Sequence, residues 1–312
     1  MKKFLYALIT ATLCLTTDAL ANETTVVDVT QYGIETLLSD PCGCTLKKPF
    51  GILLDGSYIA KAPVCGNHDQ HIHYADGQVE GLYGVKLSEN SAAFVNVGAG
   101  FDRIKWDQNP YFVKEYFPCV NVGISGYTTS VRNWIWMAGI NCQYDTNAGI
   151  VHRFTRASRY GALLWGRYTY DKCLGLHLGV LIFTGIRKTN AYPIIGFDYT
   201  LSSKWKINGI FPLNMAVIYS FTDVWSLSFA GRPFIARHRL SSNQPIQNGI
   251  FEYRNYGAEL SLNFDKCGLF WQLYAGYSFG GTLKTEDSNG NEIAYTRYDG
   301  APYVGANILW RF

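Results

Sequence analysis

Apolar and polar side chains alternate at every second position along most of this chain, and this period constrains the fold more than any other feature. In the last run, Val304, Ile308 and Trp310 share one face, whereas Asn307 and Arg311 share the other. Successive side chains of a β-strand point to opposite faces, so a period of two indicates strands, whereas an amphipathic helix repeats every 3.6 residues. The chain is therefore predicted to be all-β.

The alternating runs are long for strands, at about 9–13 residues each. Strands of soluble domains usually have about 5–6 residues, whereas a tilted strand needs roughly 9–11 residues to cross a membrane. The expected strands number about fourteen and lie at residues 50–60, 78–87, 92–102, 116–126, 132–143, 158–170, 174–186, 191–200, 204–211, 214–221, 225–236, 251–264, 268–281 and 302–312. The pair at 204–211 and 214–221 is short, so a barrel of about twelve spanning strands is the alternative.

The connections between these runs alternate in length. Residues 61–77, 144–157, 237–250 and 282–301 form long polar connections, whereas the one at 265–267 is short. Outer-membrane barrels have short periplasmic turns and longer outer loops. This parity predicts a transmembrane antiparallel up-and-down β-barrel with both termini in the periplasm.

The composition supports a membrane barrel and argues against nucleic acid as a partner. Charged residues make up only 16% of the chain and aromatic residues 15%. Soluble domains carry about 25% charged residues, whereas a barrel with one face toward lipid needs fewer. The net charge is +3 and no long run of Lys or Arg occurs, so nucleic acid is not an expected partner. The expected partner is outer-membrane lipid, because the composition suits a membrane barrel.

The N-terminus has the three parts of a cleaved signal peptide. Residues 2–3 are basic, residues 4–15 are apolar, and residues 19–21 form a small-x-small cleavage site. A lipoprotein signal is the alternative, but Leu13 before Cys14 departs from its pattern. The predicted division is a signal peptide at 1–21, a periplasmic or plug-like extension at 22–49, and the barrel at 50–312.

The last strand resembles the C-terminal signature of bacterial outer-membrane proteins. It ends in Phe312, with Trp310 two residues before it and the apolar Ile308 and Val304 on the same face. The resemblance is to the class, and it covers about residues 50–312. It implies that the barrel assembly machinery recognises this strand, and that the protein lies in a Gram-negative outer membrane.

The chain is rich in cysteine for a barrel. Its eight cysteines, less Cys14 in the signal peptide, leave seven in the mature chain. An oxidising compartment permits disulfides, and an odd count leaves one thiol over. The disulfide candidates are Cys42, Cys44, Cys65, Cys119, Cys142, Cys173 and Cys267. Pairing within the chain is the favoured expectation. The count also resembles the cross-linked envelopes of chlamydia-like bacteria, which implies disulfide-linked envelope proteins as partners.

One expected outer loop holds residues that could bind a metal. His68, His71 and His73 lie close to Cys65 and Asp69, and alternate positions of an extended chain point to one side. A solvated polar loop explains them better, so these histidines are weak candidates. No cofactor or metal is predicted.

Alternation also predicts which polar side chains face the interior. The pore-lining candidates are Arg167, His177, Asp198, Lys206, Arg232, Glu259, Gln272 and Arg311. A lining of mixed charge suits either a water-filled channel or a closed, salt-bridged barrel, and the sequence favours neither.

Three functions follow from these expectations. The first is a passive channel for small polar solutes. The second is a structural or adhesive envelope protein cross-linked by disulfides. The third and weakest is a barrel hydrolase or protease that uses Asp102 or His152. The chain is predicted not to be an enzyme, since no His is followed two residues later by Ser.

Overall fold

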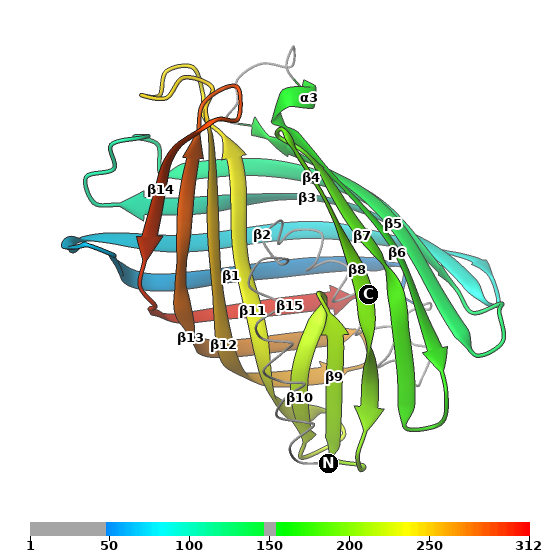
Figure 1. The fold of residues 1–312 in the computed structure, drawn as a ribbon. Coiled ribbons are helices and arrows are strands. Elements are labelled where there is room, and N and C mark those ends of the chain that lie inside the picture. The colour runs from blue at the N-terminus through cyan, green and yellow to red at the C-terminus, as the bar shows by residue number, and fades with distance from the viewer. Residues whose placement is uncertain (1–47, 147–153) are drawn as a thin grey trace.

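One antiparallel sheet of fifteen strands closes on itself to form a barrel (Figure 1). The computed structural model describes residues 48–146 and 154–312, and only the backbone of His68. The strands are β1 (Phe50–Val64), β2 (Asn67–Ser88), β3 (Ser91–Trp106), β4 (Tyr116–Thr128), β5 (Trp134–Asp145), β6 (Ser158–Thr169), β7 (Leu174–Gly185), β8 (Lys188–Thr200), β9 (Trp205–Phe211), β10 (Asn214–Ser220), β11 (Trp225–Arg239), β12 (Ile250–Lys266), β13 (Leu269–Glu286), β14 (Glu292–Tyr298) and β15 (Pro302–Arg311). A single helical turn, α3 (Phe154–Ala157), precedes β6, and no helix in the described ranges is long and apolar enough to cross a membrane.

The first and last strands close the barrel. Gly51–Ile59 of β1 pairs with residues 303–311 of β15, and the ends are joined by a backbone hydrogen bond from Phe312 N to Phe50 O at 2.9 Å. Strand β14 continues the row of β15 along β13. The wall therefore has fourteen strand positions, as the alternating runs predicted.

The twelve-strand alternative is wrong. Strands β9 and β10 have seven residues each, yet β9 pairs with β8 and β10 pairs with β11. A short hairpin still occupies two places in the hydrogen-bonded ladder, because it must satisfy its neighbours' backbone groups.

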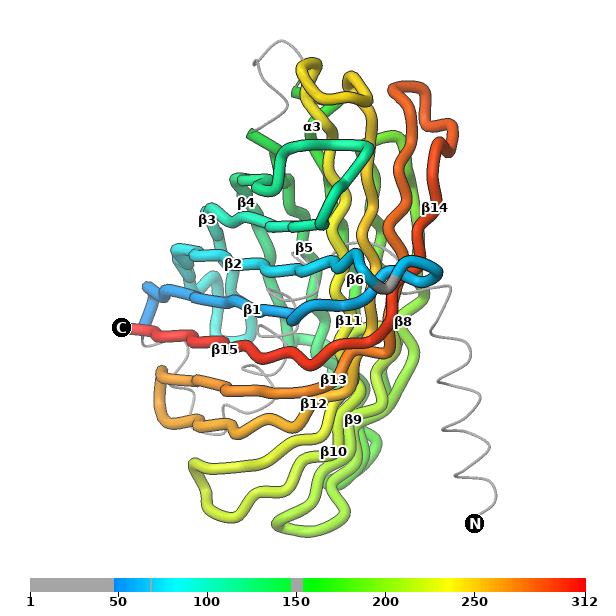
Figure 2. The backbone as a smooth tube through the Cα atoms, turned by 90° about the vertical axis from the view of Figure 1, so that its left-hand side faces the viewer, coloured from blue at the N-terminus to red at the C-terminus, as the bar shows by residue number. Residues whose placement is uncertain are grey.

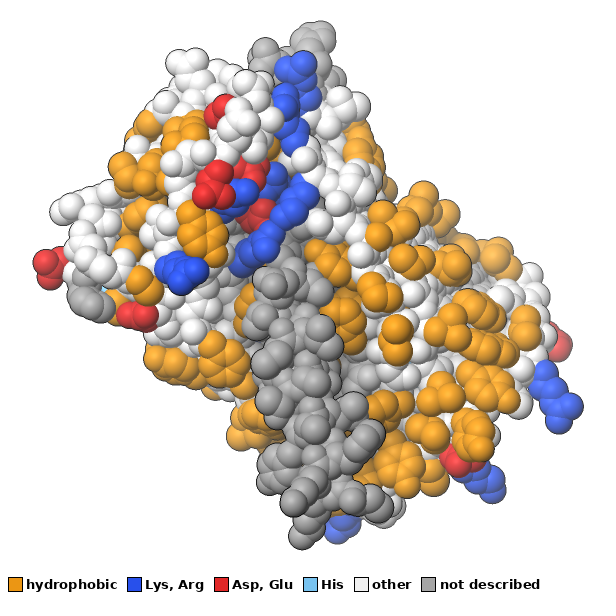
Figure 3. Space-filling model, viewed as in Figure 1, with side chains coloured by type: hydrophobic (Ala, Val, Ile, Leu, Met, Phe, Trp, Pro, Cys, Tyr) orange, Lys and Arg blue, Asp and Glu red, His pale blue; other side chains and the backbone are white. Residues whose placement is uncertain are grey.

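The outward face of the barrel is apolar, whereas the inward face carries both polar and apolar side chains. In β1, Ile52, Leu54 and Tyr58 are exposed, whereas Asp55 and Ser57 between them are buried. Figure 3 shows apolar side chains spread over the lower right of the face in view. A barrel in water would have the reverse arrangement, so this surface suits a hydrocarbon environment.

The two ends of the barrel differ. Aromatic rings gather at the end that holds Phe312, called here the C-terminal end, where the connections are short. Phe50 stacks on Phe312 with ring centroids 6.2 Å apart, and Trp134 stacks on Trp136 at 4.9 Å. Rings at this level fit the interface between hydrocarbon and water. The opposite end is called the loop end.

Two predicted loops at the loop end are strands. Residues 61–77 belong to β1 and β2, which meet in a tight turn at Gly66, whose φ is +82°. Residues 282–301 are largely the hairpin of β13 and β14. Their polar composition predicted loops, but strands that extend beyond an apolar band are polar because both faces meet water or other polar groups.

The loop-end halves of four strands leave the line of the wall together and bend toward the inside of the barrel. The irregularities lie at one level: a register shift at Asn255–Gly257 in β12, Gly280 in β13, and the break at 299–301 between β14 and β15. Gly280 has φ +89°, and an added Cβ there would lie 2.6 Å from the Tyr298 carbonyl oxygen. Figure 2 shows β12 and β13 turning upward from this level. Residues 231–239, 250–257, 281–286 and 292–298 are called the flap.

Candidate functional site

The interior of the barrel is the candidate site, and its opposite walls touch at the loop end. Fourteen strands about 4.8 Å apart and tilted by about 40° would enclose a round barrel roughly 28 Å across. Yet His238 of β11 and Asp102 of β3, six places apart in the ladder, lie 2.6 Å apart from Nε2 to Oδ2. The barrel is therefore pinched where the flap folds inward.

The inner face of the flap packs on β1–β4 through an apolar core. The ring of Tyr253 stacks on Tyr74 with centroids 4.5 Å apart, and Phe251 meets Phe117 edge-on at 4.5 Å. The buried members are Ile59, Ala62, Val64, Ile72, Tyr74, Ile104, Phe112, Phe117, Phe234, Ala236, Leu240, Phe251, Tyr253, Tyr274, Leu283, Tyr298, Ala301 and Tyr303. This set is called the flap core, and it closes one side of the lumen.

A second apolar cluster lies on the inward face of the opposite wall. It joins β5–β9 and is centred on Trp165, Leu181 and Ile194, all fully buried. The lumen is thus divided between two apolar clusters and the polar groups between them.

A buried ion cluster is set into the flap core. Nε2 of His238 faces Asp102, and its Nδ1 lies 3.1 Å from Oδ1 of Asp145. The Tyr74 hydroxyl donates to Asp102 at 2.6 Å, and Arg159 lies 4.0 Å from Asp145. Since both ring nitrogens face carboxylates, the arrangement suits a doubly protonated imidazolium that holds the walls together.

This cluster does not support the hydrolase hypothesis. A general base must have a ring nitrogen that can accept a proton, and both nitrogens of His238 face acceptors. Asp102 is occupied by its hydrogen bonds to Tyr74 and His238. The other candidate, His152, lies outside the described residues.

Three of the predicted pore-lining residues form one hydrogen-bonded group on β6–β8. The Arg167 guanidinium donates to both carboxylate oxygens of Asp198, at 2.7 and 2.8 Å, and His177 Nε2 lies 2.6 Å from Asp198. The Trp165 indole N–H donates to His177 Nδ1 at 3.1 Å. Nδ1 is thereby the acceptor, so His177 is a neutral imidazole that donates from Nε2 to Asp198.

Three more candidates meet on β11–β13. Arg232 donates to both oxygens of Glu259, at 2.6 and 3.0 Å, and its guanidinium carbon lies 3.9 Å from the centroid of the Tyr274 ring. Gln272 accepts from Arg232 at 3.4 Å and from Asn307 at 2.8 Å. These residues were predicted separately, and the fold brings them into one bidentate ion pair with its polar partners.

The last two candidates lie nearer the C-terminal end. Lys206 and Arg311 are half-buried on inward positions, and the Arg311 guanidinium lies 5.9 Å from the Phe94 ring centroid. All eight candidates thus fall on the inward face. Their part in a pore stays a prediction.

Sequence reasoning missed two interior groups. Glu80, fully buried, accepts hydrogen bonds from Asn96 at 3.2 Å and Asn121 at 2.5 Å across β2–β4. Alternation within 78–87 would have placed Glu80 inward. His238 carried no such signal, because residues 237–250 were interpreted as a loop.

The wall between β8 and β11 has an interruption at the loop end. Because β9 and β10 are short, β8 pairs with β9 only from Ile195 onward, and β11 pairs with β10 only up to Ala230. Within the described residues, 188–194 and 231–239 therefore have no strand between them. Each of these two segments carries a proline, Pro193 or Pro233, which cannot donate a ladder hydrogen bond. This interruption is called the seam.

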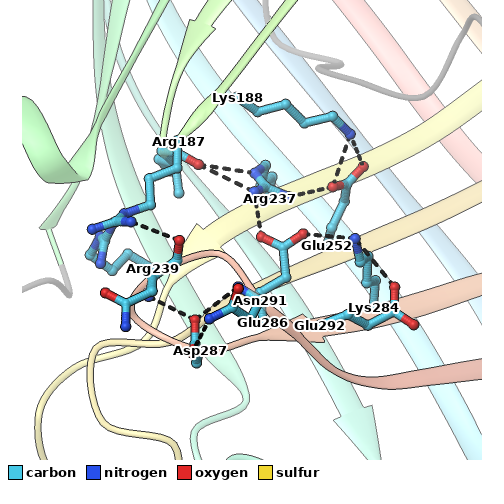
Figure 4. A network of polar contacts seen from close by, with 12 residues as sticks. Arg187, Lys188, Arg237, Arg239, Glu252, Lys284, Glu286, Asp287, Asn291 and Glu292 are labelled. Carbon is cyan, nitrogen blue, oxygen red and sulfur yellow. Dashed lines mark hydrogen bonds and ion pairs between the residues drawn. The ribbon is translucent and has the colours of Figure 1, made fainter.

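Side-chain hydrogen bonds and ion pairs join the two sides of the seam (Figure 4). Arg237 on the opposite face of the flap donates to the Ile186 carbonyl at 3.3 and 3.2 Å and to Glu286 at 2.8 Å. Arg237 also pairs with Glu252, which accepts from Lys188 at 3.2 Å. These residues, with Arg187 and Asn289, are called the clamp.

The clamp continues to the turn between β13 and β14. Arg187 donates to the Asn289 carbonyl at 2.7 Å, which links the β7–β8 turn to this turn. Asp287 accepts from the side chain of Asn291 at 2.9 Å and from the backbone N–H of Asn289 at 2.7 Å. The hydrogen bond from the Asn291 side chain lowers the pKa of Asp287, because it stabilises the carboxylate.

The predicted disulfides within the chain are wrong for the cysteines that the structure describes. No disulfide joins any of Cys65, Cys119, Cys142, Cys173 and Cys267. The barrel separates them: Cys119 is buried inside, Cys142 is on the outward face of the next strand, and the others lie in turns. Cys42 and Cys44 lie outside the described residues.

Two of the histidines singled out in the sequence, His71 and His73, lie on an outward face of β2. His71 Nδ1 is 3.5 Å from Asp107, and the Tyr58 hydroxyl is 3.2 Å from His73 Nδ1. Across residues 48–146 and 154–312, no group of three or more His, Cys, Asp or Glu side chains is placed to hold a metal ion. The side chain of His68 lies outside this description.

Comparisons with known proteins find relatives of unknown function. No family model matches the chain. An uncharacterised protein of Chlamydia pneumoniae is 27% identical over 200 residues, 62% of this chain and 61% of that protein. One of Chlamydia trachomatis is 24% identical over 64% of this chain and 62% of its own. The match thus spans about three fifths of these relatives' length.

Solved structures with a similar arrangement are outer-membrane barrels. An outer-membrane channel from Pseudomonas putida F1 has a TM-score of 0.47 and 10% identity, over 85% of this chain and 95% of that chain. A FadL homologue from Pseudomonas aeruginosa also has a TM-score of 0.47 and 10% identity, over 86% and 91%. LpxR from Salmonella typhimurium has a TM-score of 0.35 and 8% identity, over 84% and 100%. These values leave the activity of this chain open.

Proposed function

We propose that this protein is a channel of a Gram-negative outer membrane that passes small polar solutes. One observation carries the proposal. A closed barrel with an apolar outward face has an inward face lined by fixed ion pairs, such as Arg232–Glu259 and Arg167–Asp198.

Charges on the inward face favour a hydrated path over a dry core. An ionised side chain is costly to bury without a partner or water, and replacing a buried ion pair with apolar residues is often neutral or stabilising. A wall that served only stability would need fewer such pairs. Placed around a lumen, they would instead attract or repel solutes by charge.

The flap narrows the lumen at the loop end in the arrangement described. The flap core joins opposite walls, and the His238 cluster lies within it. Conduction therefore depends on the position of the flap at this end.

We further propose that both termini lie in the periplasm and that the barrel assembly machinery recognises the last strand. Val304, Ile308, Trp310 and Phe312 all lie exposed on one outward face, which supports recognition from the lipid side. The short turns at the C-terminal end support the periplasmic orientation.

Planar-bilayer recording of the refolded protein tests the channel. Wild type should show discrete openings, and Arg232→Gln with Glu259→Gln should shift the preference between cations and anions. Leu260→Ala, on the exposed outward face of the same strand as Glu259, is the matched control and should not change selectivity. A properly folded wild type that never opens, at any voltage or salt, contradicts the proposal.

A structural envelope role is the second candidate. It is favoured by the exposed positions of Cys65, Cys173 and Cys267 in turns at both ends of the barrel, where none forms a disulfide within the described chain. Non-reducing gels of intact envelopes test it. A band that runs only as the monomer without reductant excludes disulfide-linked partners.

A further inference from the structure

Strands β1, β2 and β3 carry three basic side chains at one level of their outward face, near the loop end. His73 of β2 pairs with Lys105 of β3, and Lys61 of β1 comes directly before Ala62, which pairs with Ile72. Lys61 and Lys105 are exposed, and His73 is half-buried. Figure 2 shows the three strands side by side. These three residues are called the basic row.

The two lysines of the basic row form no ion pair with any residue of 48–146 or 154–312. Two carboxylates near them are engaged by other cations or by histidine. Asp107 lies 3.5 Å from Nδ1 of His71, and Glu115 accepts from the Arg103 guanidinium at 3.0 Å. The basic row therefore presents two ammonium groups whose charge no described ion pair offsets.

His73 adds a directed donor between the two lysines. The Tyr58 hydroxyl lies 3.2 Å from its Nδ1. When this hydroxyl donates, Nδ1 is the acceptor and the proton of the neutral imidazole lies on Nε2. Nε2 and the two ammonium groups can then donate to one ligand group that has several acceptor oxygens. A phosphate monoester fits, because it carries close to two negative charges and three strong acceptor oxygens.

The surface on the C-terminal side of the basic row is apolar. Gly77 of β2 pairs with Phe101 of β3, whose ring lies over the glycine: a Cβ added to Gly77 would be 2.9 Å from it. Beyond this pair, Val79 pairs with Ala99. Phe101 and Val79 are 41% and 46% exposed. The basic row therefore lies at the border of the apolar band, where a lipid headgroup would meet it.

Two other borders of the apolar band carry uncharged side chains instead. Toward the loop end of β5–β7, the paired outward positions hold Tyr160 and Thr184, next to Tyr144. At the C-terminal end of β1 and β2, Phe50 and Tyr83 lie with ring centroids 5.0 Å apart. The basic row is thus a feature of one wall and of one end of the band.

We propose that the basic row binds the phosphate of a lipid headgroup in the leaflet at the loop end, with the acyl chains against Phe101 and Val79. The ligand is a lipid that carries a phosphate monoester. Its headgroup complements the charge of the row, and its chains match the apolar surface beside the row. This inference goes beyond the proposed channel, because it needs a membrane barrel and no conduction.

Native mass spectrometry of the refolded full barrel tests the site with lipid A, either with its phosphates or freed of them. Wild type should retain the phosphorylated form preferentially. Lys61→Gln with Lys105→Gln should weaken that binding about thirtyfold, since each cation near an anionic lipid contributes about fivefold. Lys172→Gln with Lys204→Gln, at exposed turn positions of the C-terminal end, is the matched control and should bind as wild type does.

Two outcomes of this measurement overturn the proposal. One is equal binding of phosphorylated lipid A by wild type and by the Lys61→Gln, Lys105→Gln variant. The other is inorganic phosphate that binds as tightly as the phosphorylated lipid, because the acyl chains would then contribute nothing.

Photo-cross-linking tests where the acyl chains lie. Phe101→p-benzoylphenylalanine, in phosphatidylcholine vesicles with a trace of phosphorylated lipid A, should form adducts enriched in lipid A. Adding Lys61→Gln and Lys105→Gln should abolish the enrichment. Phe229→p-benzoylphenylalanine, at an exposed ring on β11, is the control and should show none. Equal enrichment at both positions overturns the site. Neither experiment measures conductance, so a protein that binds the lipid and never conducts contradicts only the channel.

Discussion

The two faces of the flap are held by different chemistry. The inner face buries aromatic rings such as Phe251 and Tyr253 against β1–β4, whereas the opposite face presents Arg237 and Glu252 to the β7–β8 turn. Truncating a buried aromatic ring costs about 3–5 kcal/mol, whereas a hydrogen bond to a charged group contributes about 1.5–3 kcal/mol. One face is held by buried apolar rings, and the other by ion pairs and hydrogen bonds.

The largest effect on stability is expected in the flap core. Phe251→Ala removes a fully buried ring that contacts Phe112 and Phe117, and should lower the free energy of unfolding by about 3–5 kcal/mol. Urea unfolding in detergent, followed by tryptophan fluorescence, measures it. Phe279→Ala, at a ring that is 65% exposed, is the control. Similar losses for both variants would remove the distinction between the faces.

A smaller effect on stability, with a larger effect on opening, is expected at the clamp. Arg237→Ala removes the hydrogen bonds to Ile186 and Glu286 and should cost about 1.5–3 kcal/mol locally. The open probability in planar bilayers should rise about tenfold or more, while the urea midpoint moves less than in Phe251→Ala. Arg132→Ala, exposed in a turn at the C-terminal end, should change neither. Unchanged gating in Arg237→Ala would show that the clamp does not hold the seam.

High salt should affect the two faces of the flap differently. In the Lys188–Glu252 pair the lysine is 31% exposed and the glutamate 1%, and the Lys284–Glu292 pair between β13 and β14 is 33% and 51% exposed, so ions can screen the exposed partners. The screening length falls from about 10 Å at 0.1 M to about 3 Å at 1 M salt. High salt should therefore increase the open probability and leave the unfolding of the flap core unchanged. Openings that become rarer at high salt would contradict this ranking.

The smallest effect is expected from acid at the β13–β14 turn. The Asn291 side chain holds the pKa of Asp287 below its ordinary value of about 3.9. The order it confers is therefore complete above that ordinary value and is lost as the pH falls through the lowered pKa. Acidification should weaken the Arg187–Asn289 contact and raise the open probability slightly. Asp287→Asn should lack this response, and an identical response in the variant would assign it to another group.

Local alternation predicted the wall and much of its lining. Whether Arg167, His177 and Asp198 face inward depends only on a period of two within each strand, so the sequence contains that information. The meeting of His238 with Asp102 depends on the inward bend of the flap, which joins residues 136 positions apart. No local pattern encodes that bend, and the polar strands beyond it were interpreted as loops.

The disulfide prediction failed for a related reason. Counting thiols assumes that any two can meet, whereas a rigid wall fixes Cys119 inside and Cys142 outside. The short hairpin at 204–221 was noticed in the sequence as an irregularity. Its consequence, the interruption of the ladder between β8 and β11, needed the register of both strands.

The closure between β1 and β15 has a consequence for how the chain acquires its fold. Gly51 pairs with Arg311, so two strands 260 positions apart in the sequence complete the ring. Until these strands meet, both expose a row of unpaired backbone groups, which is the surface that promotes edge-to-edge aggregation. Contacts of such long sequence separation also form slowly, because the ends of the chain must first find each other. The period before ring closure is therefore the stage at which a holding chaperone would matter most to this protein.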